Sequence, residues 1–265
     1  MTSRRKNQAN EFMTLRVYLI STASLQSGLQ QFLSDRALTW DRGGFAGDAE
    51  DLVEAAGRIC YLSFGARQFR KSNAEYIDNL IAQGHESVLE HANFTLLIDG
   101  ISRSLSHQLV RHRIGFAYSQ LSQQYKDELD AHFVEPPGLE GNPDALNRWR
   151  WFMQEARTLY GELLNASYST DVGSSKRERH RWIRNIARSV LPNATTTTLM
   201  ITGNARAWRH LLDVRGNIEG DHEMREYCAE VFRTLSAVAP SLFADYELVS
   251  DVLGVAVRKP SRTDR

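Results

Sequence analysis

The sequence lacks several features by which common classes of protein are identified. Only Cys60 and Cys228 occur in 265 residues, far apart and each within an apolar pattern typical of a helix. The short ligand spacings of a zinc site are missing, so we expect both thiols to be buried core residues. None of the eight histidines forms an HxxxH or HExxH pair, so we also expect no metal site.

Long apolar runs and an excess of one charge are also missing. No apolar segment approaches the roughly 20 residues of a membrane-spanning helix, and the polar start MTSRRKNQANEF precedes no apolar region. We therefore expect a cytoplasmic protein without a membrane partner. Basic and acidic residues are equal at 32 each, so no overall field attracts nucleic acid, and we expect none as a partner. Any anion site must be local.

The glycine-rich loops GxxxxGK[ST] and GxGxxG, which hold nucleotides, are absent as well. What is present is strong hydrophobic periodicity. It predicts strands over 14–20, 91–99 and 195–202, and helices over 48–64, 72–83, 144–166, 204–215 and 221–238, with others from Ser102 and up to Pro192. The predicted fold class is α+β, a single domain with a mixed or antiparallel sheet and several long helices. We assign residues 1–12 to a disordered arm, 13–249 to the domain and 250–265 to a C-terminal tail.

The stretch RHRIGFAYSQLSQQY, residues 111–125, carries two arginines and a histidine ahead of hydroxyls and amides, without an acidic residue. Guanidinium groups match phosphate oxygens, which a carboxylate would repel. The stretch therefore favours a phosphorylated, nucleotide-sized ligand. A solvated turn followed by a polar loop or an edge strand explains the same residues. The polar groups that such a ligand would use are Gln108, Arg111, His112, Arg113, Ser119, Gln120, Ser122, Arg188, Asn204, Arg206 and Arg215.

A second cationic feature lies in KRERHRWIRNIARSVLP. Its arginines at 177, 181, 184 and 188 share one helical face and repel each other unless an anion or carboxylates lie opposite. The stripe is typical of a solvent-exposed face with salt bridges, and it also fits a ligand site. Together with Trp182 it is compatible with a protein of another class, an RNA-binding module without catalysis.

These motifs, taken together, resemble the flavin-dependent thymidylate synthases. The family signature RHRxxSxNExSxRY is similar to RHR at 111–113 with YSQLSQQY behind it, and GHESVLEH resembles GHx[ST]xxEH. ARSVLP and NARAWRHLLDVR follow in the family's order. The resemblance implies a homotetramer with active sites at subunit interfaces. It implies that methylenetetrahydrofolate gives a methylene group to carbon 5 of a uracil nucleotide, with hydride from reduced FAD that NADPH recharges.

The resemblance also assigns roles to single residues. The positions that match the family's FAD contacts are Ser87, Arg111, His112, Arg113, Asn204, Arg206 and His210. Those that match its nucleotide contacts are Gln108, Arg111, Gln120, Ser122, Gln124, Arg188 and Arg215. Arg215, near the uracil ring, and Arg111 are the expected catalytic residues, which stabilise charge that develops on the uracil.

Two departures from the signature bear on the substrate. Eight residues, 114–121, separate Arg113 from Ser122 where the signature has seven, so a bulge or a longer turn must accommodate one residue. Gln124 stands where the signature has an arginine that helps to hold the substrate phosphate; Lys126 or the arginine stripe is the expected replacement. We therefore expect a homologue that methylates UMP, as in nucleoside-antibiotic pathways, with dUMP as the second candidate and the standard thymidylate synthase reaction as the alternative.

Overall fold

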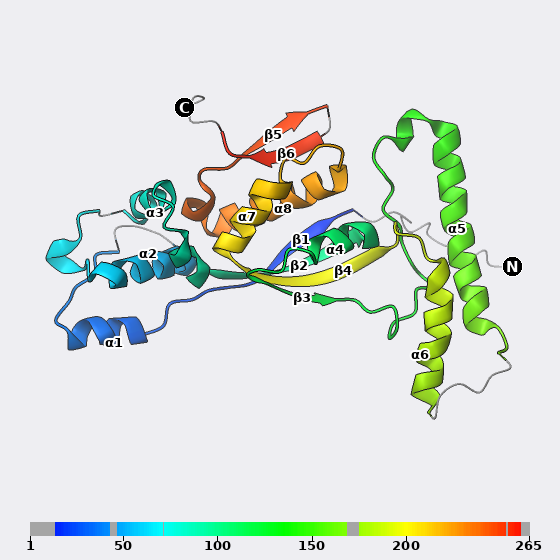
Figure 1. Ribbon diagram of the computed structural model, residues 1–265, viewed down its shortest axis with the longest axis horizontal. Coiled ribbons are helices and arrows are strands. Elements are labelled where there is room, and N and C mark those ends of the chain that lie inside the picture. The colour runs from blue at the N-terminus through cyan, green and yellow to red at the C-terminus, as the bar shows by residue number, and fades with distance from the viewer. Residues whose placement is uncertain (1–13, 43–46, 71, 169–174, 253, 261–265) are drawn as a thin grey trace, which may run out of the picture. The chain divides into compact units, whose positions relative to one another are not determined.

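The computed structural model of the protein describes residues 14–42, 47–70, 72–168, 175–252 and 254–260 (Figure 1). The predicted N-terminal arm lies outside the described residues. The strands are β1 (Arg16–Thr22), β2 (Asn93–Ser102), β3 (Phe116–Gln120), β4 (Thr196–Asn204), β5 (Glu247–Asp251) and β6 (Gly254–Arg258). The α-helices are α1 (Gly28–Asp35), α2 (Asp48–Tyr61), α3 (Asn73–Ala82), α4 (Arg103–Leu109), α5 (Pro143–Asn165), α6 (Lys176–Ala187), α7 (Ala205–Arg215) and α8 (His222–Val238).

Local signals in the sequence account for most helix boundaries. The side chains of Ser72, Ser102 and Asn204 accept hydrogen bonds from backbone N–H groups in the first turns of α3, α4 and α7, as N-caps do. Gly84, with φ of +70°, follows α3 in the left-handed conformation that glycine adopts without strain. The predicted helices over 48–64, 72–83, 144–166, 204–215 and 221–238 are confirmed to within a few residues.

The main sheet has the strand order β1-β2-β4-β3, and its strands are antiparallel. The Thr95 hydroxyl lies 3.0 Å from that of Thr202, and the Thr198 hydroxyl donates to Asp99 at 2.7 Å, so β2 and β4 run in opposite directions. Buried and less buried positions alternate along both strands, as the period of two requires. The predicted strand pattern and the α+β class are confirmed.

By density of contacts the chain divides into two compact units made of interleaved segments. The first unit contains residues 98–111 and most of 119–199, and the second contains 112–118 and most of 17–97 and 200–260. Strands β2, β3 and β4 each contribute residues to both units. The two units are therefore parts of one α+β domain, as the sequence predicts.

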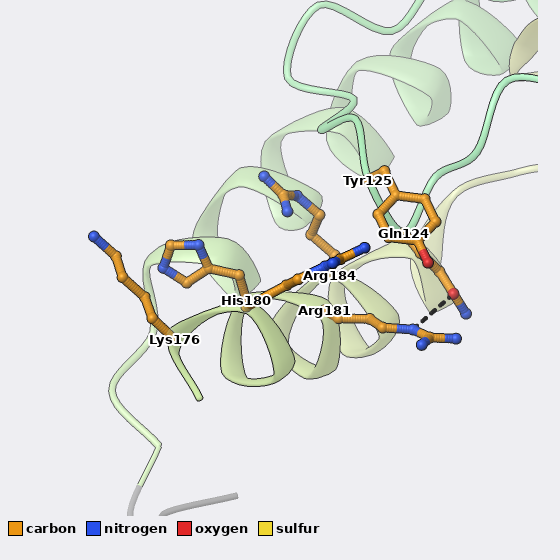
Figure 2. A pocket seen from close by; sticks show the side chains of 7 residues that line it. Gln124, Tyr125, Lys176, His180, Arg181 and Arg184 are labelled. Atoms are coloured by element: carbon orange, nitrogen blue, oxygen red, sulfur yellow. Dashed lines mark hydrogen bonds between the residues drawn. The ribbon is translucent and has the colours of Figure 1, made fainter. Parts of the chain in front are cut away.

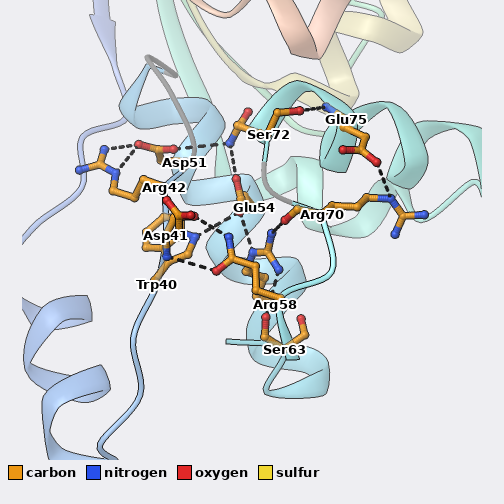
Figure 3. Close-up of polar contacts among 12 residues, drawn as sticks. Trp40, Asp41, Arg42, Asp51, Glu54, Arg58, Ser63, Arg70, Ser72 and Glu75 are labelled. Carbon is orange, nitrogen blue, oxygen red and sulfur yellow. Dashed lines mark hydrogen bonds and ion pairs between the residues drawn. The ribbon is translucent and has the colours of Figure 1, made fainter. Parts of the chain in front are cut away.

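The second unit has a core of large side chains from β2, α7 and α8. Trp208, Phe94 and Tyr227 are fully buried, and the Trp208 indole N–H donates to the Gly203 carbonyl at 3.1 Å. A polar network around α2 is buried beside this core (Figure 3). In it Glu54 accepts hydrogen bonds from Arg58 at 2.6 Å, Trp40 at 3.1 Å and Asn73 at 2.9 Å.

The first unit contains the pairing of α5 with α6, in which the shorter α6 packs against part of α5. Met153 and Trp149 of α5 pack against Phe133 in a small apolar cluster. The Tyr160 hydroxyl of α5 accepts a hydrogen bond from the Glu128 backbone N–H at 2.9 Å. This packing fixes α6 beside the loop that follows β3.

The structure departs from one sequence expectation and contains elements that the sequence did not predict. Cys60 is exposed at the C-terminal end of α2, so its predicted burial is wrong, because it lies on the outer face of that helix; Cys228 is buried, as predicted. Part of the predicted tail, residues 254–258, forms β6, which pairs with β5 and packs on α8. Helix α1 carries no long apolar pattern that would predict it.

Candidate active site

The residues expected to contact FAD lie in the second unit, apart from Arg111. Ser87 is exposed on the 3₁₀ helix Glu86–His91, and Arg113 is exposed in the turn before β3. The side-chain oxygen of Asn204 caps α7 by accepting from the Ala207 N–H at 2.8 Å. Within the described residues Arg113 pairs with no carboxylate. This donor set suits the phosphates of a dinucleotide such as FAD.

His112 and Arg215 form the most specific contact among the predicted site residues. The Arg215 Nε–H donates to His112 Nε2 at 3.1 Å, so the imidazole is neutral with its proton on Nδ1. Burial lowers the pKa of His112, and the positive charges of Arg215 and His210 lower it further. The Tyr118 hydroxyl donates to the His112 carbonyl at 2.7 Å. Arg215 is thus oriented by a neutral group and keeps its full charge for a ligand.

Arg206 differs from the other predicted FAD residues because carboxylates surround it. Its guanidinium lies 2.7 Å from Glu90 and 3.6 Å from Glu86, both on the 3₁₀ helix that carries Ser87. The hydrogen bond to Glu90 raises the pKa of Arg206. Its contact with FAD remains a prediction, and the geometry gives it a second role in holding this helix to α7.

The extra residue of the signature lies in the turn before β3. The backbone bonds Asn204 N–H to Gly115 O and Leu121 N–H to Thr198 O span six residues on each strand, so no bulge interrupts the pairing. Gly115 has φ of +78°, and an added Cβ there would lie 2.7 Å from the Ala207 Cβ. Ile114 is 95% exposed. A longer turn therefore accommodates the extra residue between His112 and the nucleotide residues of β3.

The residues expected to contact the nucleotide lie in the first unit, apart from Arg215. The Gln120 amide donates to the Ser106 hydroxyl at 3.0 Å and to that of Thr197 at 3.3 Å. The Ser122 hydroxyl accepts from the Gln124 N–H at 3.3 Å. Gln108 is partly buried on α4 and Arg111 is exposed beyond its end. The YSQLSQQY segment is an edge strand as far as Gln120 and then a loop.

Two pockets flank the arginine stripe, which runs along α6 as predicted. One, of about 370 Å³, contains Gln124 (Figure 2), and the other, of about 400 Å³, contains Arg188. Arg188 donates to Asn185 at 2.6 Å. The second pocket is also lined by Arg103, whose guanidinium donates to Leu121 O at 3.1 Å and to the Thr197 hydroxyl. Burial lowers the pKa of Arg103.

Sequence reasoning missed Arg103 and Tyr125 as site residues. Arg103 follows the Ser102 cap as the first residue of α4. A cation is unfavourable at the start of a helix, and this unusual position is the signal by which the sequence could have indicated Arg103. Tyr125 ends the quoted stretch, and its ring lies within 6.0 Å of the guanidinium carbons of Arg177 and Arg181. Only the folded chain brings these aromatic and cationic groups together.

Nowhere in the described chain do three or more His, Cys, Asp or Glu side chains gather as metal ligands would. Each helix there is too short or too polar to cross a bilayer.

The fold and this set of guanidinium, amide and hydroxyl groups suit a class of protein with an anionic ligand. Comparison with known proteins identifies the class. Residues 45–241 match the family model of the thymidylate synthase complementing proteins. The flavin-dependent thymidylate synthase of Mycolicibacterium gilvum (strain PYR-GCK) is 42% identical over 250 residues, which cover 93% of this chain and 96% of the relative.

Two further relatives carry the same description. The flavin-dependent thymidylate synthase of Mycobacterium tuberculosis (strain ATCC 25177 / H37Ra) is 41% identical, covering 93% of this chain and 96% of its own. That of Mycobacterium sp. (strain JLS) is 41% identical over 90% of this chain and 92% of its own. The chain belongs to the thymidylate synthase complementing family, the flavin-dependent thymidylate synthases, and is a methyltransferase that uses FAD.

Proposed function

We propose that this enzyme methylates carbon 5 of the uracil ring in a pyrimidine nucleoside monophosphate. Methylenetetrahydrofolate is the carbon donor in this proposal and NADPH the reductant. FAD, when bound, supplies the hydride. The proposed assembly is a homotetramer in the cytoplasm, with sites at subunit interfaces.

The observation that carries the proposal is the pair formed by Arg215 and His112. A guanidinium that donates to a neutral imidazole keeps its positive charge and is fixed in direction. Such a group stabilises negative charge that develops on a uracil oxygen in the transition state. Arg111, exposed beyond α4, is the second proposed catalytic cation. The RNA-binding alternative is not favoured because the family match spans the RHR motif as well as the stripe.

UMP is the favoured substrate and dUMP the second candidate. The added residue lengthens the turn between His112 and Gln120, the segment of the chain that joins an expected flavin residue to an expected nucleotide residue. This change supports room for a 2′-hydroxyl, and Gln124 supports altered phosphate surroundings. The relatives are described as thymidylate synthases, and this description is the reason that dUMP stays a candidate here.

Turnover on UMP and on dUMP, offered separately, tests the proposal. We expect a higher kcat/KM for UMP, and deletion of Ile114 should shift the ratio toward dUMP by about tenfold, the value of roughly 1.4 kcal/mol. The control Gln124→Arg should change KM for both nucleotides and leave their ratio unchanged. Wild-type preference for dUMP would contradict the UMP assignment, whereas methylation of neither nucleotide would contradict the proposed function.

A further inference from the structure

His112 lies in an irregular segment, yet other elements hold both its backbone and its ring. The segment between α4 and β3 that carries it forms neither helix nor strand. The Tyr118 hydroxyl of β3 donates to the His112 carbonyl at 2.7 Å, and the Arg215 Nε–H of α7 donates to His112 Nε2 at 3.1 Å. His112 therefore connects the hydroxyl of β3 to the guanidinium of α7.

An aromatic cluster holds Tyr118 in this position. Phe116 and Tyr118 share one face of β3 because they are two residues apart, and their ring centroids are 5.9 Å apart. Phe116 in turn meets the buried ring of Trp208 edge-on at 4.9 Å, an arrangement that aromatic pairs prefer. An added Cβ at Gly203 would lie 2.5 Å from the Phe116 ring, so any larger residue there would displace this ring. Packing in the core thus sets the place from which Tyr118 reaches His112.

The Tyr118 hydroxyl is a neutral donor at every pH at which the protein is folded. Burial raises its pKa above the usual 10, so the hydroxyl keeps its proton. The charged groups that act on His112 are instead Arg215 and His210, both of α7. The bond from Tyr118 therefore restrains the position of His112 without adding a charge to the candidate site.

A second tyrosine provides a contrast within the same core. Tyr227 of α8 is fully buried and is an electrostatic neighbour of Tyr118. Its hydroxyl has no hydrogen-bond partner among the described residues. The two side chains therefore differ in what their hydroxyls do, since that of Tyr118 is bonded to a residue of the candidate site.

We propose that Tyr118 is a positioning residue for the reaction, which fixes the backbone of His112 so that the imidazole orients Arg215. The inference rests on the proposed function, in which Arg215 stabilises charge that develops on the uracil ring. Tyr118 acts through His112 and takes no part in the chemical step. Without its hydroxyl the His112 carbonyl loses this partner, the ring moves relative to Arg215, and the guanidinium is no longer fixed in direction.

Steady-state kinetics of two single variants test this role. Tyr118→Phe removes only the hydroxyl. Because the loss affects the transition state more than the bound substrate, we expect kcat to fall about three- to tenfold, with KM for the nucleotide changed by less than about twofold. The control Tyr227→Phe removes the hydroxyl that has no partner and should keep both constants at their wild-type values.

The pH dependence of activity separates a positioning role from a purely structural one. Burial and the charges of Arg215 and His210 hold the pKa of His112 below its usual 6.5. In Tyr118→Phe the less restrained imidazole is better solvated, so its pKa should rise toward 6.5. The fall of kcat/KM at acid pH should therefore begin at a higher pH than in the wild type or in Tyr227→Phe.

Urea unfolding of the flavin-free protein gives the same comparison without catalysis. His112 contributes stability that is lost as the pH falls from about 7 to about 5, because the unfolded chain takes up the proton first. This loss should be smaller in Tyr118→Phe, whose folded and unfolded pKa values for His112 lie closer together, than in Tyr227→Phe.

Three results would overturn the inference. They are an unchanged kcat in Tyr118→Phe, a loss confined to KM, and a pH dependence of activity and unfolding equal to that of Tyr227→Phe. Wild-type protein that carries its flavin but methylates neither UMP nor dUMP would instead contradict the proposed function.

Discussion

The arginines of the two units differ in what neutralises their charge. In the second unit Arg58, Arg209 and Arg225 are buried, and each lies 2.6–2.7 Å from a carboxylate. In the first unit the arginines of α6 are more exposed and line a pocket without acidic groups. The first group stabilises the fold, and the second is available to an anion. Composition alone, with equal numbers of acidic and basic residues, hides this division.

Arg215 lies between these two cases. It belongs to the second unit, yet its hydrogen bond goes to the imidazole of His112 and not to a carboxylate. The bond orients the guanidinium without neutralising it. In this unit the hydrogen-bond partner therefore distinguishes Arg215, a candidate catalytic group, from the structural arginines that pair with carboxylates. Mutation can test this distinction.

The largest expected effect comes from breaking a buried pair. Replacing Glu54 with Gln keeps the volume of the side chain but leaves Arg58 as a buried charge without its carboxylate (Figure 3). We expect a loss of about 3–5 kcal/mol in the free energy of unfolding, measured by urea denaturation. The control Glu75→Gln removes a carboxylate that is 61% exposed and 3.9 Å from Arg70, and should cost less than about 1 kcal/mol. Equal losses would show that the buried network has no special role.

A smaller, pH-dependent effect is expected at His112. Only the neutral imidazole accepts from Arg215, and the pKa of His112 lies below its usual 6.5 because of burial and the nearby charges of Arg215 and His210. The unfolded chain therefore takes up this proton first. The contribution of His112 to stability is full above pH 6.5 and is lost as the pH falls through the lower folded value.

Activity should follow the same direction. We expect kcat/KM to fall at acid pH as His112 becomes protonated, and His112→Gln, whose amide oxygen accepts at every pH, should lose this acid limb. Initial rates from pH 5 to 8 with saturating flavin provide the measurement. If the fall of kcat/KM at acid pH is unchanged in His112→Gln, the group that causes this fall is not His112.

The smallest expected effect comes from adding a carboxylate to the stripe. In Arg177→Glu the new side chain lies four residues before Arg181, and such a pair stabilises a helix by about 0.3–0.5 kcal/mol. The same change should weaken UMP binding. The control Arg179→Glu adds the same charge to the first turn without a cation four residues later, and should leave both quantities near their wild-type values. A loss of stability in Arg177→Glu would mean that the stripe is not self-repelling.

Much of the fold could be predicted from the sequence because its signals are local. The caps at Ser72 and Asn204 and the stop at Gly84 act within one helical turn, and the alternation along β2 and β4 spans only a few residues. Helix α1 and strands β5 and β6 were missed because each is too short for a clear hydrophobic period, and β6 also depends on its packing against α8. Cys60 shows the same limit, since periodicity does not say which side of a helix is covered.

The residue types of the candidate site could be predicted from the sequence, but the partners to which these side chains bind could not. The sequence offers Arg181 and Arg206 as equivalent cations, but Arg206 meets Glu90, 116 residues away, whereas Arg181 meets Gln124, 57 residues away. Neither separation can be found from the period of a helix or a strand. The sequence also left the extra residue as a bulge or a longer turn, and the unbroken register between β3 and β4 selects the turn.

One measurement tests the account most directly. UMP and dUMP at equal concentration are incubated with the enzyme, FAD, methylenetetrahydrofolate and NADPH. The products are then separated, identified and quantified by mass spectrometry. The account predicts 5-methyl-UMP as the main product, with a smaller amount of thymidylate. Thymidylate as the main product would contradict the UMP assignment, and a mixture that contains neither methylated nucleotide, from protein that carries its flavin, would contradict the proposed function.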